Sequence, residues 1–198
     1  MKYPFTFLFL VPLALITNAC GSSMNTPDIK HNPHPKMRYE ITLTIKDAPG
    51  PFDSAEGYVS YEVANEQCAP FERFAGIYRT PPSQHLAFSL SRFSNNEYKG
   101  IVYLDLLQDE DYYGFGMCHW SVNSVSAALS YKQVTFTTSI TLSELLMQEP
   151  STEYLWKEAY FHPVAGSHEI GLLPTDEFKH KYPERYFTAT LAVKERFE

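Results

Sequence analysis

The sequence lacks the motifs that mark most hydrolases and nucleotide-dependent enzymes. It contains no G-x-S-x-G nucleophile elbow, no H-E-x-x-H zinc motif and no glycine-rich phosphate loop. His119 is a conceivable catalytic base, but a histidine on the surface of a strand is the commoner arrangement. We therefore expect a protein that is not an enzyme and that uses neither a cofactor nor a metal.

Positive charge is also scarce. The chain has 16 Lys and Arg residues against 23 Asp and Glu residues, which gives a formal net charge of −7 at pH 7. A protein that binds nucleic acid needs clustered cations to neutralise phosphates, and the sequence has no such cluster. The charge therefore argues against a nucleic-acid partner and fits a basic protein partner.

A long apolar run occurs only at the start of the chain. Lys2 precedes an apolar segment from Phe5 to Ile16. An apolar stretch of roughly a dozen residues behind a positive charge is typical of a secretory signal peptide, and it is too short to span a membrane. We expect residues 1–19 to be this signal peptide and the protein to leave the cytoplasm.

The end of that segment resembles the bacterial lipobox, in which a diacylglycerol is attached to a cysteine before the signal peptide is cut off. Cys20 follows Ala19 as in the lipobox, although Thr17 stands where leucine is usual. The resemblance implies a lipid-anchored Cys20, and several acyl chains hold a protein firmly to a membrane. Because Gly21 follows the cysteine, it also implies the outer membrane, facing the periplasm. The alternative is a soluble periplasmic protein.

Cysteine is otherwise limited to Cys68 and Cys118. The two residues have neither the C-x-x-C spacing of a redox pair nor further soft ligands for a metal. In an exported protein the simplest expectation is a disulfide between them. Closing a loop of about 50 residues stabilises a domain by at most about 4 kcal/mol in the chain-entropy estimate.

The chain divides by composition into a tether and one domain. Residues 20–37 are rich in Gly, Ser, Asn and Pro and are expected to form a flexible tether. From residue 38 onward, apolar and polar residues alternate as in half-buried strands. The alternating runs cover 38–46, 59–63, 86–90, 98–106, 115–131, 134–140 and 185–197. Residues 38–198 are therefore expected to form a single β-rich domain.

Local signals refine this pattern. The apolar phase shifts by one residue at Asn123-Ser124, which predicts a β-bulge or a turn. Thr141 and Glu144 have the spacing of a capping box, which predicts a short helix over 142–148. The aromatic-rich region 154–161 fits a helix or a strand. Together the runs predict an all-β, antiparallel β-sandwich or barrel-like domain with one or two short helices.

The most polar feature is an acidic segment followed by two tyrosines: Asp109, Glu110, Asp111, Tyr112 and Tyr113. Adjacent carboxylates cannot be buried unpaired, so the segment is expected to be a loop. Its spacing does not match an EF-hand calcium loop. Three interpretations remain. The segment is a solvated hairpin tip, or a partner-binding element in which carboxylates steer a protein and tyrosines anchor it. The third is a metal site that uses the carboxylate oxygens for calcium.

Two stretches of the sequence resemble bacterial type VI secretion immunity lipoproteins. They are residues 39–52 and residues 109–114, the latter leading to Cys118-His119-Trp120. The resemblance implies a periplasmic protein that binds and inhibits a secreted toxin, a lipase-type effector such as a phospholipase. Two other classes stay open: a lysozyme-inhibitor-like lipoprotein and a structural lipoprotein of the envelope.

Intact-mass analysis of the membrane-extracted protein tests the predicted lipidation. We expect a mass larger than that of the chain from Cys20 onward, by the mass of the attached acyl groups. The Cys20→Ser variant should be released as soluble protein. A wild-type protein found entirely in the soluble fraction would contradict the lipid anchor.

Overall fold

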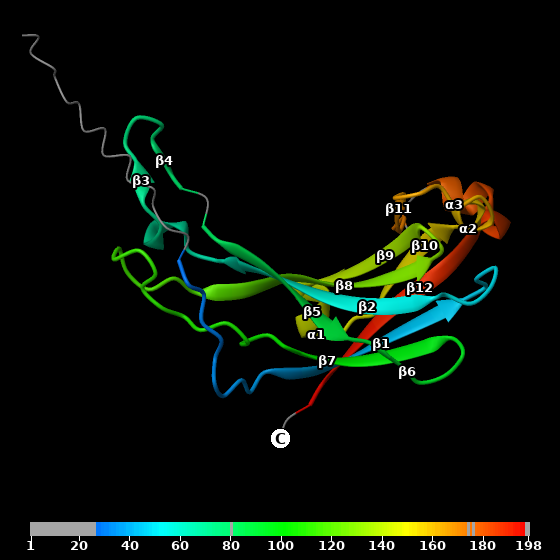
Figure 1. Cartoon of the computed structure of the whole chain (residues 1–198), viewed down its shortest axis with the longest axis horizontal. Helices are drawn as coiled ribbons and strands as arrows, with labels where there is room; N and C mark the ends of the chain where they lie inside the picture. Colours follow the sequence, from blue (N-terminus) through cyan, green and yellow to red (C-terminus); the bar gives the residue numbers. More distant parts are fainter. Residues whose placement is uncertain (1–26, 80, 174, 176, 197–198) are drawn as a thin grey trace, which may run out of the picture.

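The computed structural model describes residues 27–79, 81–173, 175 and 177–196. The predicted signal peptide and Cys20 lie outside these residues. Two five-stranded sheets pack face to face as an open sandwich (Figure 1). The described strands do not close into a barrel, so of the two expected architectures the structure confirms the sandwich.

In each sheet, several neighbouring strands come from segments that are far apart in the sequence. The first sheet contains, in order, β10 (Ser151–Trp156), β12 (Tyr186–Glu195), β1 (Arg38–Lys46), β7 (Glu97–Tyr103) and β6 (Ser91–Arg92). The second contains β11 (His168–Ile170), β9 (Val134–Thr141), β8 (Trp120–Tyr131), β2 (Ser54–Val63) and β5 (Ser83–Ser89). The short β11 lies parallel to β9, whereas the other pairs are antiparallel.

The core lies between the inward faces that the alternation predicted. Leu43 on β1, Leu191 on β12, Leu129 on β8 and Phe136 on β9 are fully buried. The rings of Phe136 and Phe187 meet edge to face with centroids 5.4 Å apart. Burial of a Leu or Phe side chain contributes roughly 1.5–3 kcal/mol, so these facing strands are the main source of the domain's stability.

The local signals are confirmed. Ser124 pairs with Ser60 but Val122 pairs with Tyr61, so Asn123 is the extra residue of a β-bulge. Helix α1 (Leu142–Met147) begins at a capping box between Thr141 and Glu144. The ambiguous region 154–161 contains a strand followed by a helix: β10 ends at Trp156, and helix α2 (Lys157–Phe161) follows.

Other elements differ from the expectation. The run 115–131 becomes a strand only at Trp120. The region after β2 contains the short helix η1 (Glu66–Cys68) and a hairpin of β3 (Phe71–Glu72) and β4 (Ile77–Tyr78). Helix α3 (Glu177–Lys181) and the turn η2 (Pro183–Arg185) precede β12. These elements are too short to leave a periodic pattern in the sequence.

Part of the predicted tether packs against the domain. His31 forms a main-chain bridge with Leu107. The carboxylate of Asp105 accepts hydrogen bonds from the main-chain N–H groups of Lys36 and Met37, at 2.8 and 3.0 Å. Residues 31–37 of the predicted tether therefore lie against the domain, because a carboxylate outside that segment satisfies its main chain.

Glu153 is a buried carboxylate on β10. The residue is 4% exposed, and its Oε1 accepts hydrogen bonds from the N–H and hydroxyl of Ser139. Its Oε2 has no partner of normal geometry among the described residues and lies against Gly171. Burial raises the pKa of the Glu153 carboxyl, and hydrogen bonding from Ser139 opposes the shift only in part.

Glu153→Gln should raise the melting temperature near neutral pH, because it removes a buried charge and keeps an acceptor for Ser139. A raised pKa means that the folded state binds the proton more tightly than the unfolded state does. The wild type therefore loses stability as the pH rises from the ordinary pKa of a carboxyl group through the raised pKa of Glu153. We expect the variant to gain about 1–3 kcal/mol at pH 7 and much less near pH 4. Thermal unfolding at several pH values measures this, with the exposed Glu149→Gln as the control. A variant that is less stable at every pH would show that the charge itself is needed.

Candidate functional site

Two long loops meet at one end of the sandwich (Figure 1). One connects β2 to β5 and carries Cys68, and the other connects β7 to β8 and carries Cys118. The two cysteines form a disulfide, with Cα atoms 5.2 Å apart, and both are buried. The predicted pairing is confirmed, and it joins two loops that also share a main-chain hydrogen bond, from the N–H of Ala64 to the carbonyl of His119.

A small apolar cluster surrounds this disulfide. Val63 is buried in it, and Tyr112, Tyr113 and Trp120 pack around it. The Tyr112 ring meets Trp120 edge to face at 6.3 Å, and its hydroxyl donates a 2.6 Å hydrogen bond to the carbonyl of Gln108. Burial raises the pKa of the Tyr113 hydroxyl. The two tyrosines of the candidate partner-binding segment therefore support the loop from inside.

Two of the acidic side chains also fix the loop. Asp109 accepts a 2.8 Å hydrogen bond from the main-chain N–H of Trp120, and its other oxygen lies 2.7 Å from Nδ1 of His119. Asp111 accepts a hydrogen bond from the main-chain N–H of Gly114 at 2.7 Å. Both residues remain exposed, so they combine a structural contact with charge at the surface.

The third acidic residue connects the loop to the start of the described chain. Glu110 pairs with Lys30 at 2.6 Å, and this hydrogen bond raises the pKa of the Lys30 amine. The main-chain carbonyl of Glu110 accepts a 2.9 Å hydrogen bond from Cys118. The segment around Lys30, the acidic loop and the disulfide thus form one connected unit.

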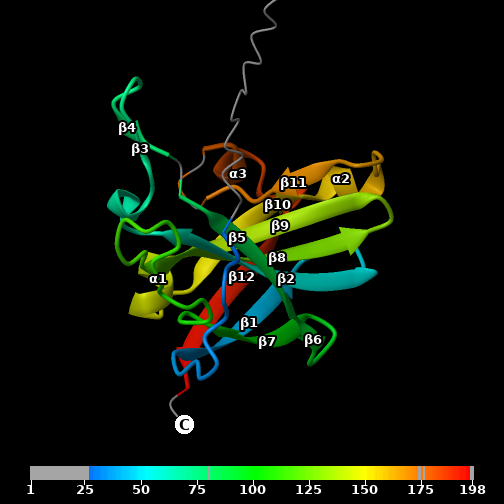
Figure 2. The same cartoon turned by 60° about the vertical axis from the view of Figure 1, so that its left-hand side comes forward.

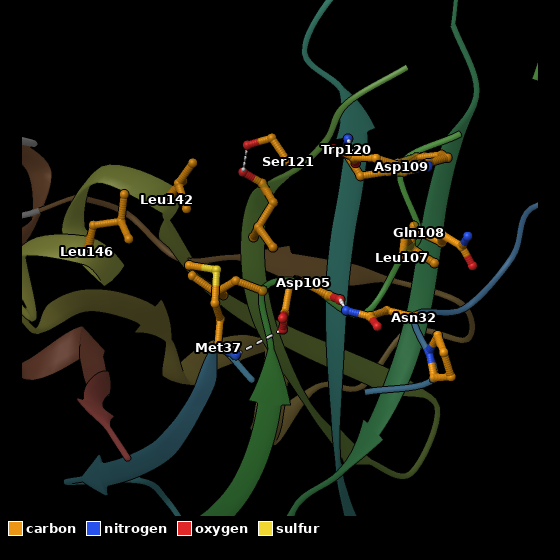
Figure 3. Close-up of a pocket in the computed structure, with 13 residues that line it drawn as sticks. Asn32, Met37, Asp105, Leu107, Gln108, Asp109, Trp120, Ser121, Leu142 and Leu146 are labelled. Atoms are coloured by element: carbon orange, nitrogen blue, oxygen red, sulfur yellow. Dashed lines mark hydrogen bonds between the residues drawn. The ribbon is translucent and has the colours of Figure 1, made fainter. Parts of the chain in front are cut away.

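A cavity of about 660 Å³ opens beside the acidic loop (Figure 3). Figure 3 shows Leu142 and Leu146 of α1 on one side and Trp120 on the other, with Met37 and Asp105 between them. Its apolar wall is made by Pro33, Met37, Leu104, Leu107, Trp120, Val122, Leu142 and Leu146. Its polar rim is made by Asn32, Asp105, Gln108, Asp109 and Ser121.

The sequence predicted only a part of this site. Asp109 was identified from its charge, and it lies at the cavity rim. Met37, Leu142 and Leu146 were not identified, because apolar residues in a tether or a short helix give no signal of a cavity. His119 is exposed and hydrogen bonds to Asp109, while its neighbour Cys118 is used in the disulfide.

Comparisons with protein families, with curated proteins and with solved structures find no match to this chain. Within the described residues, no group of three or more His, Cys, Asp or Glu side chains could hold a metal ion. In the same part of the chain, no helix is long and apolar enough to cross a membrane. The function is therefore inferred from the geometry of this end of the sandwich.

Replacing both Cys68 and Cys118 by Ser should open the two loops while leaving the sheets folded. We expect a loss of up to about 4 kcal/mol of stability and faster proteolysis within 64–82 and 104–119, because the cross-link no longer holds the loops together. Denaturant unfolding and limited proteolysis followed by mass spectrometry measure both effects. The reduced wild type is the matched control and should behave like the variant, because both lack the disulfide. Loops of the variant that are cleaved no faster than those of the oxidised wild type would contradict the role given to the disulfide.

Proposed function

We propose that this protein is a lipid-anchored immunity protein of the outer membrane, facing the periplasm, that binds and inhibits a type VI secretion toxin. The toxin is a lipase-type effector, and the sequence resemblance favours a phospholipase. The observation that supports binding is the apolar cavity with the acidic loop at its rim. No chemistry on a substrate is assigned to the chain itself.

The cavity suits an apolar side chain of a protein partner. Its volume of about 660 Å³ falls in the range of ordinary binding sites. Met37 and Leu146 on its wall are 44% and 52% exposed, so a partner that covers them removes apolar surface from water. The disulfide and the carboxylate contacts hold the surrounding loops before binding, which lowers the entropy lost on association.

The charge of the rim favours a basic partner surface. Asp105 and Asp109 line the cavity, and Asp111 lies in the same loop. Rim charges act mainly on the association rate, because they steer the encounter before the apolar surfaces meet. The formal net charge of −7 adds a field of the same sign at longer range.

A second candidate function fits the same rim. A lysozyme-inhibitor-like lipoprotein would bind a basic peptidoglycan hydrolase, and an acidic surface beside a cavity serves that partner too. The two candidates differ in which purified enzyme is inhibited. A structural role in the envelope would require inhibition of neither enzyme.

Tyr112 and Tyr113, the predicted anchors for a partner, are poor positions for testing binding, because both pack against the disulfide cluster. Substitutions at Tyr112 and Tyr113 would disturb the cluster around the disulfide, and so would measure stability as well as binding. Charge reversal at Glu110 would break its pair with Lys30. Gln108 and Leu146 line the cavity and are exposed, so they report on binding more directly.

We expect Leu146→Arg to speed dissociation from the toxin at least tenfold, because a charge replaces an apolar contact at the cavity wall. Gln108→Lys should slow association a few-fold at low salt, and the difference should shrink as salt screens the added charge. We expect a phospholipase to be encoded next to this gene, and the measurement is surface-immobilised binding kinetics against that enzyme.

Matched controls come from neighbouring or distant exposed positions. Met147→Arg lies next to Leu146 on α1 but does not line the cavity, and Gln133→Lys lies in the turn between β8 and β9. Circular dichroism confirms that all four variants are folded. Equal kinetics for the cavity variants and their controls would remove the cavity from the binding site.

A further inference from the structure

Large apolar side chains extend from the loops at the disulfide end of the sandwich. The β3–β4 hairpin projects from the sheets in both views (Figures 1 and 2). Phe71 and Ile77 on this hairpin are 50% and 61% exposed, and Phe74 in its turn is fully exposed. On the neighbouring loop, Phe115 and Met117 are 62% and 49% exposed.

The described chain begins at this same end of the sandwich. Lys30 is paired with Glu110, whose main chain is bridged to Cys118, and Cys118 is bonded to Cys68 at the base of the hairpin. Figure 1 shows the blue start of the described chain beside these loops. Six residues, 21–26, stand between the predicted anchor Cys20 and Pro27. The seven steps from one Cα atom to the other span at most about 25 Å in a fully extended chain.

We propose that the tips formed by Phe71, Phe74, Ile77, Phe115 and Met117 insert into the interface of the lipid bilayer. The proposal rests on the lipid-anchor part of the proposed function, because the short connection keeps these tips close to the membrane that holds Cys20. Apolar and aromatic side chains gain free energy when they leave water for the boundary between headgroups and acyl chains.

The local charges agree with insertion. Glu72 and Arg79 form an ion pair with each other across the hairpin. Arg73 lies next to Phe74 at the turn, where a long cationic side chain can reach lipid phosphates while its stem stays in the apolar layer. The hairpin therefore meets the bilayer with little net charge. At the second tip the exposed Asp111 accepts a hydrogen bond from the main-chain N–H of Phe115, so its carboxylate stays with the headgroups while the phenyl ring inserts.

The arrangement favours a membrane over a protein partner for these tips. In Figure 1 the β3–β4 hairpin and the loop between β7 and β8 are separate projections at the same end of the sandwich. A bilayer accepts several separate apolar tips at one depth, whereas a groove on a protein needs them gathered on one surface. The cavity given to the toxin is lined by other residues.

The test uses the mature chain from residue 20 with Cys20→Ser, so that no acyl chain contributes to binding. The probe is a flotation assay with vesicles of phosphatidylethanolamine and phosphatidylglycerol. We expect measurable partition that changes little with salt, because apolar contacts are not screened. Phe74→Ser and Phe115→Ser should each lower the partition coefficient about tenfold, the effect of removing one inserted phenyl ring.

Phe93→Ser and Ile170→Ser are the matched controls, since both residues are exposed and lie outside these loops. The controls should leave the partition unchanged, and circular dichroism confirms that each variant is folded. Absence of vesicle binding by the Cys20→Ser chain without further substitution would overturn the proposal. So would equal losses in the tip and control variants, or a Phe74→Ser variant that loses toxin binding while its partition is unchanged.

The assay contains no toxin, and the protein in it carries no acyl chain. If the protein does not inhibit the toxin, the result of the flotation assay still stands. Lipidation of Cys20 is tested by a different experiment, the intact-mass analysis.

Discussion

The disulfide between Cys68 and Cys118 is the constraint on which the functional end of this protein depends. Leu104 and Leu107 attach one of the two loops to the main core, but the loops carry few other buried side chains, and their main chains are not paired within either five-stranded sheet. The bond gathers Val63, Tyr112, Tyr113 and Trp120 into a second small cluster beside the main core. Without that cluster the loops would have little apolar burial to offset the entropy of ordering them.

The carboxylates of these loops show how a segment without a ladder keeps its shape. Asp105, Asp109 and Asp111 each accept hydrogen bonds from main-chain N–H groups that no strand satisfies. Each also leaves negative charge near the cavity, so the same residues position the loop and set the charge that a partner meets. The structural role of this acidic segment is therefore compatible with the binding role that we propose for it.

Alternation along β1, β8 and β12 predicted most of the fold, because each strand buries one face and exposes the other. The bulge at Asn123 was predictable for the same reason, since one extra residue reverses the phase. The cavity was not predictable, because Met37, Leu104 and Leu146 come from three distant segments. Residues 31–37 lie against the domain because Asp105 binds their main chain, and Tyr112 packs against the disulfide. Both contacts join residues far apart in the sequence, so neither leaves a local pattern.

Titration of the proposed phospholipase toxin is the most direct test of the central claim that the protein is a stoichiometric inhibitor. Fatty-acid release from phospholipid vesicles is measured while the purified protein is added in increasing amounts. Tight binding that blocks the enzyme predicts a linear fall in activity that reaches background at one equivalent. Full activity in the presence of a large excess of the folded, disulfide-bonded protein would contradict that claim.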